Sequence, residues 1–384
     1  MKHFAKLIIF FVFFLIAAPR VFAVENPLNV PNNKVGIHIL FPQELAKAAQ
    51  LVNSNGGSWG YVVIPIQSGD KDFVKWQNFM DEAKKLHVIP IIRLATEGDY
   101  FNTKVWRKPT DADVLDFANF LNSLTWPTKN RYVIVYNEVN RGDEWGGTPS
   151  PSEYDQILSY AVDVFKARSQ DFFIISAGMD NAAANTSNTM NEYSFYRAME
   201  TDDPDIFNKI DGIASHSYPN PAFSEPPSVH TTMSITSFLY EKNLLQTFAS
   251  KDLPVFITET GWSQDAVGQQ NAAQYLSTAF QTVWNTNSVV MVSPFLLMAG
   301  SGPFTQFSLL NSDGSPNMVY QALARLPKTK GAPVVNPPQN VLAASTQINK
   351  LPIKNFHQLS SPNGFTRNLE SGFKLIFKWL LQVH

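Results

Sequence analysis

Eight short runs of apolar, β-branched and aromatic residues recur along the chain, at intervals that leave room for a helix between them. The predicted strands cover residues 35–40, 60–66, 88–94, 132–136, 172–176, 212–216, 254–258 and 289–295. Stretches with a helical pattern alternate with them, including residues 42–51, 71–86, 111–124, 151–167, 269–284 and 318–325. Short runs without polar positions are typical of buried parallel strands. The alternation predicts an α/β fold whose strands are joined by right-handed crossovers.

The number of strand and helix units predicts a particular architecture. Eight units within residues 34–326 match the size of a (β/α)8 TIM barrel. A doubly wound open sheet is the alternative, but it would usually carry a glycine-rich phosphate loop after its first strand. No such loop follows residues 35–40, so the barrel is the favoured prediction.

The first 23 residues have the pattern of a secretory signal peptide. Lys2 and Lys6 form a basic start, residues 7–18 are apolar, and Val21-Phe22-Ala23 offers small residues where a signal peptidase reads them. Twelve apolar residues are few for a transmembrane helix, although an uncleaved anchor is the alternative. We therefore predict a secreted or extracytoplasmic protein that begins near Val24.

The chain after the predicted barrel has a different composition. Residues 327–371 are rich in proline and glycine at their start and show no periodicity, which predicts a disordered linker. Residues 372–384 are strongly apolar, with Lys374 and Lys378 on one helical face. This amphipathic tail could contact a membrane surface, pack on the barrel or bind another chain.

Composition excludes several classes of protein. Without cysteine there is no disulfide framework, thiolate zinc site or cysteine nucleophile. A net charge of −2 provides no field that would recruit nucleic acid. The 12 Tyr and 8 Trp residues suit a surface that stacks on flat neutral ligands such as sugar rings. We expect a carbohydrate partner, no nucleic acid and a monomer.

Two predicted strands end on carboxylates. The run at 132–136 stops on Asn137-Glu138, and the run at 254–258 stops on Glu259. By count these are strands four and seven, so both carboxylates would face each other on the carboxyl-end rim of a barrel. Glycosidic bond cleavage uses such a pair, one to protonate the leaving oxygen and one to attack or activate water. Each glutamate alone would be interpreted as a solvated strand end.

The residues Tyr136-Asn137-Glu138, together with the stretch from Ile257 to Trp262 around Glu259, resemble the two motifs of the clan A glycoside hydrolases. The resemblance covers about residues 34–326. It implies that Glu138 is the general acid/base, that Glu259 is the nucleophile of a retaining double displacement, and that Asn137 binds the substrate 2-hydroxyl.

Further resemblance is found at strand six, which ends on His216-Ser-Tyr218, a pattern similar to glycoside hydrolase family 5. It implies that Tyr218 orients the nucleophile and that His216 lines the acid/base side. The sequence departs from that family in two places. That family usually carries an arginine at the end of strand two and a histidine at the end of strand three, whereas here strand two ends on Ile66-Gln67 and the arginine is Arg93, at the end of strand three. Arg93 could keep Glu259 ionised or form a strand-end salt bridge. The clan's tryptophan at the end of strand eight is replaced by Phe295 and aliphatic residues.

Three tryptophans are candidate sugar platforms: Trp262 beside the nucleophile, Trp145 in the loop after Glu138, and Trp106 after strand three. Each could instead anchor a loop in the core. The sequence shows no metal-ligand spacing such as His-Glu-x-x-His, so we predict no metal and no cofactor.

Two function classes remain open. The first is an exported retaining hydrolase of β-glycosidic bonds in oligo- or polysaccharides. The second is a non-catalytic carbohydrate-binding or cell-surface module on a degenerate barrel, suggested by the missing strand-eight tryptophan. An inverting mechanism would require carboxyl oxygens about 9 Å apart rather than about 5 Å.

Overall fold

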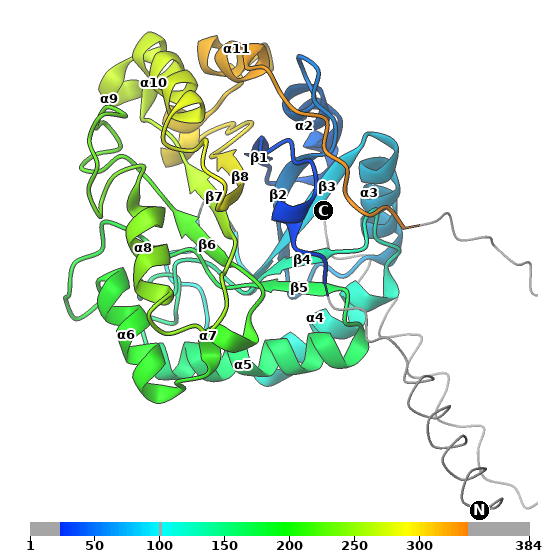
Figure 1. The fold of residues 1–384 in the computed structure, drawn as a ribbon, viewed down its shortest axis with the longest axis vertical. Coiled ribbons are helices and arrows are strands. Elements are labelled where there is room, and N and C mark those ends of the chain that lie inside the picture. Colours follow the sequence, from blue (N-terminus) through cyan, green and yellow to red (C-terminus); the bar gives the residue numbers. More distant parts are fainter. Residues whose placement is uncertain (1–23, 100–101, 337–384) are drawn as a thin grey trace, which may run out of the picture. The chain divides into compact units, whose positions relative to one another are not determined.

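The computed structural model describes residues 24–99 and 102–336 (Figure 1). Eight parallel strands form its centre: β1 (Gly36–His38), β2 (Gly60–Gln67), β3 (Val88–Ala95), β4 (Arg131–Ile134), β5 (Phe172–Ile175), β6 (Ile213–His216), β7 (Val255–Thr260) and β8 (Val289–Pro294). All eight predicted strands are present, with ends that differ by a few residues. The α/β prediction is confirmed.

The strands close into a ring. Neighbouring strands pair in the orders β1-β2-β3-β4-β5 and β6-β7-β8, all parallel. Parallel bridges close the two gaps, Ile175 to Gly212 between β5 and β6 and Val35 to Val292 between β1 and β8. A closed ring of parallel strands is a barrel, and the doubly wound alternative is wrong.

Helices surround the strands (Figure 1). They are α2 (Leu45–Val52), α3 (Phe73–Lys85), α4 (Asp111–Ser123), α5 (Pro151–Arg168), α6 (Glu192–Asp202), α7 (Ile206–Lys209), α8 (Ser237–Leu245), α9 (Gln264–Val267), α10 (Gln269–Gln281) and α11 (Met318–Arg325). Short 3-10 helices occur at η1 (Pro27–Asn29), η2 (Pro42–Glu44) and η3 (Pro303–Phe307). Several helices start as the sequence indicates: Ser150 accepts a hydrogen bond from the Glu153 N–H, with proline following at the first helical position of α5.

Strand alternation divides the apolar side chains into two layers. Tyr61 belongs to the cluster inside the barrel, whereas its neighbour Val62 packs in the layer between strands and helices. The inner cluster is aromatic: Tyr132 lies 5.0 Å from Phe173 and 5.7 Å from Phe256, measured between ring centroids. These rings come from the amino-terminal halves of their strands and fill the barrel there. Space for a ligand is left at the carboxyl ends.

The chain after α11 is ordered over the part that the structure describes. The Gly331 N–H donates to the Ser58 carbonyl at 2.9 Å, and the Lys129 N–H donates to the Val334 carbonyl at 2.8 Å. The prediction of a disordered linker is therefore wrong for residues 327–336, which pair with loops at the amino ends of the strands. Proline and glycine content predicts an irregular backbone but does not reveal whether that backbone finds hydrogen-bond partners.

Several predicted segments lie outside the described residues: the signal peptide at 1–23, the linker from residue 337 to 371, and the apolar tail at 372–384. They stay predictions. Between residues 24 and 336, leaving out 100 and 101, no helix has the length and apolar character needed to cross a membrane.

Candidate active site

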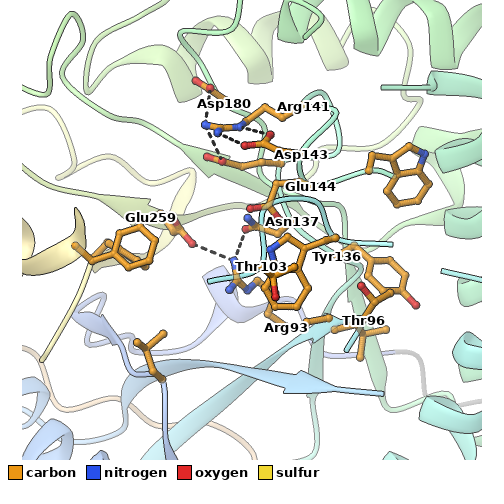
Figure 2. Close-up of a pocket in the computed structure, with 18 of the residues that line it drawn as sticks. Arg93, Thr96, Thr103, Tyr136, Asn137, Arg141, Asp143, Glu144, Asp180 and Glu259 are labelled. Carbon is orange, nitrogen blue, oxygen red and sulfur yellow. Dashed lines mark hydrogen bonds and ion pairs between the residues drawn. The ribbon is translucent and has the colours of Figure 1, made fainter. Parts of the chain in front are cut away.

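A cavity of about 420 Å³ opens at the carboxyl ends of the strands (Figure 2). Its volume lies in the range of small-molecule sites. Residues from seven of the eight βα units line it, among them Leu40 after β1, Arg93 in β3, Asn137 and Glu138 after β4, Asp180 after β5, Tyr218 after β6, Glu259 in β7 and Phe295 after β8. These residues are far apart in the sequence, and closure of the barrel brings them together.

The backbone turns sharply where β4 ends. Regular pairing stops at Ile134, and Tyr136 and Glu138 then take positive φ angles of 70° and 35°. Such values are strained for residues with a side chain and cluster at functional sites. The Glu138 N–H donates to the Gly178 carbonyl at 3.0 Å, and the Arg141 N–H donates to the Glu138 carbonyl at 2.8 Å. These bonds hold Glu138 beyond the strand, at the cavity.

Glu259 is held by two donors from other strands. It is the second-last residue of β7 and is 7% exposed. The Arg93 guanidinium donates to Oε1 at 3.2 Å, and the Tyr218 hydroxyl donates to Oε2 at 3.1 Å. The same Arg93 nitrogen donates to the Asn137 side-chain oxygen. Arg93 therefore fixes Asn137 and Glu259 relative to each other.

His38, at the end of β1, also faces Glu259, with Nε2 3.6 Å from Oε1. Complete burial lowers the pKa of His38 well below its usual range, and the positive charge of Arg93 acts in the same direction. The imidazole is thus neutral at physiological pH, and its approach to Glu259 is a polar contact rather than an ion pair.

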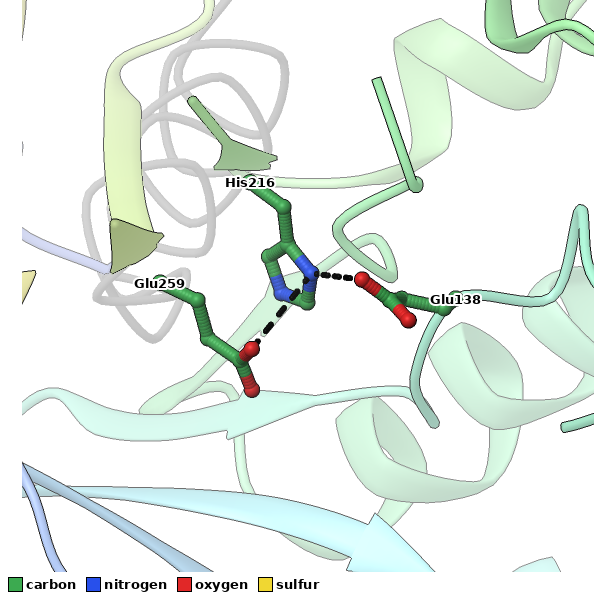
Figure 3. Close-up of side chains that lie close together, drawn as sticks. All are labelled: Glu138, His216 and Glu259. Carbon is green, nitrogen blue, oxygen red and sulfur yellow. Dashed lines mark hydrogen bonds and ion pairs between the residues drawn. The ribbon is translucent and has the colours of Figure 1, made fainter. Parts of the chain in front are cut away.

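Glu138 shares a short hydrogen bond with His216 (Figure 3). His216 Nδ1 lies 2.9 Å from a Glu138 oxygen and 3.8 Å from a Glu259 oxygen. Burial opposes charge on the imidazole, but the negative charge of Glu259 and the bond to Glu138 raise the pKa of His216 overall. Burial likewise acts to raise the pKa of Glu138, yet the His216 bond and the Arg141 charge lower it overall. Both shifts act in the same direction: they favour an imidazolium at His216 beside a carboxylate at Glu138 in the ligand-free protein.

The two glutamates approach each other closely. One oxygen of Glu138, one oxygen of Glu259 and a ring nitrogen of His216 all lie within 4.8 Å of one another. This set could ligate a metal ion by geometry alone. The Arg93 guanidinium already lies against Glu259, however, and a fixed positive charge there opposes a divalent cation.

Two of the predicted sugar platforms are buried in the protein core. Trp262 is 3% exposed, donates its indole N–H to the Glu225 carbonyl at 2.8 Å, and packs on Trp284. Trp145 is 1% exposed and packs edge-on against Tyr154. Trp145 is nevertheless one of the residues that line the cavity. Almost nothing of either ring is exposed, so neither is available to stack on a sugar, and the platform prediction is corrected for both. Their large apolar rings are needed to anchor the loops after β7 and β4.

Phenylalanines occupy the region where the clan has its strand-eight tryptophan. Phe295 follows β8 and packs against Phe304 at 5.3 Å and Phe307 at 6.2 Å between ring centroids. Phe223, from the loop after β6, packs against Phe307 at 5.0 Å. All four line the cavity, as does the half-buried Trp106. The cavity therefore has an aromatic wall without the expected tryptophan.

Sequence reasoning missed four polar residues of the site: His38, Arg141, Glu144 and Asp180. Arg141 forms ion pairs with Asp143 at 2.6 Å and with Asp180 at 3.2 Å, and it lies 3.6 Å from Glu138 (Figure 2). All four missed residues occur in or soon after a predicted strand end. A systematic list of polar residues at those positions would have included them.

The sequence matches no protein-family model and no curated protein. Solved structures do match it. A family 39 glycoside hydrolase from Bacteroides cellulosilyticus is 17% identical, with a TM-score of 0.54 over 79% of this chain and 64% of that one. A GH39 β-xylosidase from Caulobacter crescentus is 16% identical, with a TM-score of 0.53 over 77% and 71% of the two chains. A GH128 endo-β-1,3-glucanase from Sorangium cellulosum is 14% identical, with a TM-score of 0.52 over 76% and 98%.

These similar structures are glycoside hydrolases with the clan A fold. The chain covers less than two thirds of the first of them, at 64% of its length. At such low identity the likeness shows the fold, and it agrees with the resemblance seen in the two glutamate motifs.

The burial of Trp262 leads to a prediction about stability. Trp262→Ala should lower the free energy of unfolding by about 3–5 kcal/mol, because it leaves a cavity in the core. Phe73→Ala, at a ring that is 49% exposed, is the control and should change it by about 0.5 kcal/mol or less. Chemical denaturation measures both. Wild-type stability in Trp262→Ala would show that the ring is not a structural anchor.

Proposed function

We propose that this protein is a retaining glycoside hydrolase that cleaves β-glycosidic bonds in oligo- or polysaccharides. The observation that carries the proposal is the approach of Glu138 and Glu259, with one oxygen of each within 4.8 Å. Retaining enzymes place their carboxyls about 5–5.5 Å apart, whereas inverting enzymes leave about 6.5–9.5 Å for a water molecule. The fold supports the proposal, and β-linked substrates are suggested by the β-xylosidase and the endo-β-1,3-glucanase among the similar structures.

In the proposed first step, Glu259 attacks the anomeric carbon. A bond forms between its carboxylate oxygen and that carbon, and the bond from the carbon to the leaving oxygen breaks. Arg93 and Tyr218 orient the attacking carboxylate by donating to its two oxygens. Asn137, fixed by Arg93, is the group proposed to bond the sugar 2-hydroxyl, a contact that strengthens in the transition state.

Glu138 supplies the proton that the leaving oxygen takes up. In the ligand-free site this proton lies on His216, and the 2.9 Å bond is a direct path for its transfer to Glu138. Once Glu259 is esterified its negative charge is gone, which favours the ionised form of Glu138. Glu138 then accepts a proton from the water that cleaves the glycosyl-enzyme and restores Glu259.

The proposal involves no metal and no cofactor, since proton transfer and covalent catalysis by the two glutamates suffice. The predicted signal peptide supports an activity outside the cytoplasm, and the proposed partner is a carbohydrate. Phe295 lies at the end of β8, where the clan has its tryptophan, and its largely buried ring is part of the aromatic wall of the cavity.

A substrate panel tests the proposed function. Aryl β-glycosides, β-glucans, mannans and galactans should include at least one substrate that the wild type cleaves. Glu138→Gln should lower kcat by about 10²- to 10⁴-fold, because a general acid/base is lost. Glu259→Gln should abolish turnover, because no nucleophile remains. Binding without turnover across the panel would instead favour a carbohydrate-binding module, and full activity in either variant would exclude the assigned roles.

The Glu138–His216 pair predicts a shift in pH dependence. Activity requires that the pair hold one proton, and the raised pKa of His216 places the loss of that proton above pH 6.5. In His216→Gln, Glu138 must hold the proton alone. The alkaline limb of the pH profile of kcat/KM should therefore move to lower pH. His230→Gln, at an exposed histidine, is the control and should leave the limb in place. An unchanged limb in His216→Gln would show that the pair does not share the catalytic proton.

A further inference from the structure

Glu144 is a carboxyl group of the cavity to which the mechanism assigns no role. It lies on the turn after β4, is half-buried and lines the cavity beside Asn137 (Figure 2). Over residues 24–99 and 102–336, its side chain has no hydrogen-bond or ion-pair partner. The turn itself is fixed by backbone bonds, such as the one from the Glu144 N–H to the Arg141 carbonyl at 3.3 Å. Glu144 is therefore positioned by the backbone while its side chain remains unused.

The other acidic groups that line the cavity all have partners. Glu259 accepts from Arg93 and Tyr218, and Glu138 bonds His216. Arg141 pairs with both remaining carboxylates, those of Asp143 and Asp180. Glu144 is the exception in this set.

The unpaired carboxyl is costly to the folded protein. Burial, together with the negative charges of Glu138 and Asp143, raises the pKa of Glu144 to about 7 against the opposing effects of Arg93 and Arg141. A carboxyl whose pKa is raised by folding makes the native state less stable as pH rises from its unfolded value to 7 and beyond. A residue that lowers stability while it faces a cavity is typical of a functional site.

We propose that Glu144 is a specificity-determining residue that binds hydroxyl groups of the sugar next to Asn137. The inference rests on the proposed function and deepens it. A carboxylate has two acceptor oxygens and no donor, so it suits two neighbouring hydroxyls that each donate one bond.

The proposed role of Glu144 has a consequence for proton exchange. Hydroxyl groups that donate to Glu144 stabilise its ionised form, so sugar binding lowers the pKa of Glu144 and releases a proton to the buffer near pH 7. A residue with a purely structural role would not couple sugar binding to proton release in this way.

Stability is measured first, in Glu144→Gln and Glu144→Ala, with Glu82→Gln, at a partly exposed glutamate outside the cavity, as the matched control. At pH 8 Glu144→Gln should have a Tm equal to or above that of the wild type, because a buried charge without a partner is removed. At pH 4, where the carboxyl is protonated in both states, the gain should vanish. A Tm lower than that of the wild type at pH 8 would assign Glu144 a structural role and overturn the inference.

Binding is measured next, by calorimetry in the Glu259→Gln background, which should not cleave the ligand. The probes are cellohexaose, laminarihexaose, xylohexaose and mannohexaose, each at pH 7 in two buffers of different ionisation enthalpy. Adding Glu144→Gln or Glu144→Ala should weaken binding about 10- to 100-fold, as expected for a lost hydrogen bond to a charged group. Proton release should also fall, whereas Glu82→Gln should change neither quantity.

The outcomes separate the inference from the proposed function. Unchanged affinity and proton release in the Glu144 variants, with binding intact, would overturn the role of Glu144 alone. If the wild type cleaves none of the glycoside panel and binds none of the four hexasaccharides, both the proposed function and the inference fail.

Discussion

The close approach of two carboxylates, Glu138 and Glu259, is the constraint on which the rest of the site depends. Two like charges within 4.8 Å, both largely removed from water, repel each other strongly unless positive groups lie beside them. The site supplies these groups from separate strands: Arg93 from β3 lies against Glu259, and His216 from β6 lies between the two glutamates. The barrel is the means by which these distant residues reach one point.

The strained backbone after β4 brings Glu138 into this arrangement of charges. Glu138 does not continue β4 but leaves it through positive φ angles at Tyr136 and at Glu138 itself. Packing stabilises this strained backbone, because Trp145 and Tyr154 are buried against each other in and after the loop that follows. A rigid turn keeps Glu138, Asn137 and Glu144 at fixed positions around the cavity, which is the preorganisation that the proposed catalysis requires.

The sequence was sufficient for the barrel and for the two glutamates, because both depend on local patterns. Apolar runs repeat eight times, and a carboxylate that ends a buried strand is visible without a structure. The exposure of an aromatic ring depends instead on distant residues. Trp262 beside a catalytic motif has the same local sequence whether it faces a sugar or, as here, Trp284. His38 and Glu144 occur in or soon after predicted strands, so the sequence could have named them as candidates, but only the assembled barrel shows that His38 faces Glu259 and that Glu144 lines the cavity. Residues 327–336 likewise find their partners in loops far away in the sequence.

The central claim is that Glu259 becomes covalently bound to the sugar, and trapping of the intermediate tests it most directly. A panel of 2-fluoro β-glycosyl fluorides derived from glucose, xylose, mannose and galactose would be incubated with the protein, and the peptides analysed by mass spectrometry. Fluorine slows both chemical steps, while the good fluoride leaving group lets the first proceed, so the intermediate accumulates. The account predicts one fluoroglycosyl group on the peptide that contains Glu259, attached to that residue. A label on another residue, or hydrolysis products of inverted anomeric configuration, would contradict it.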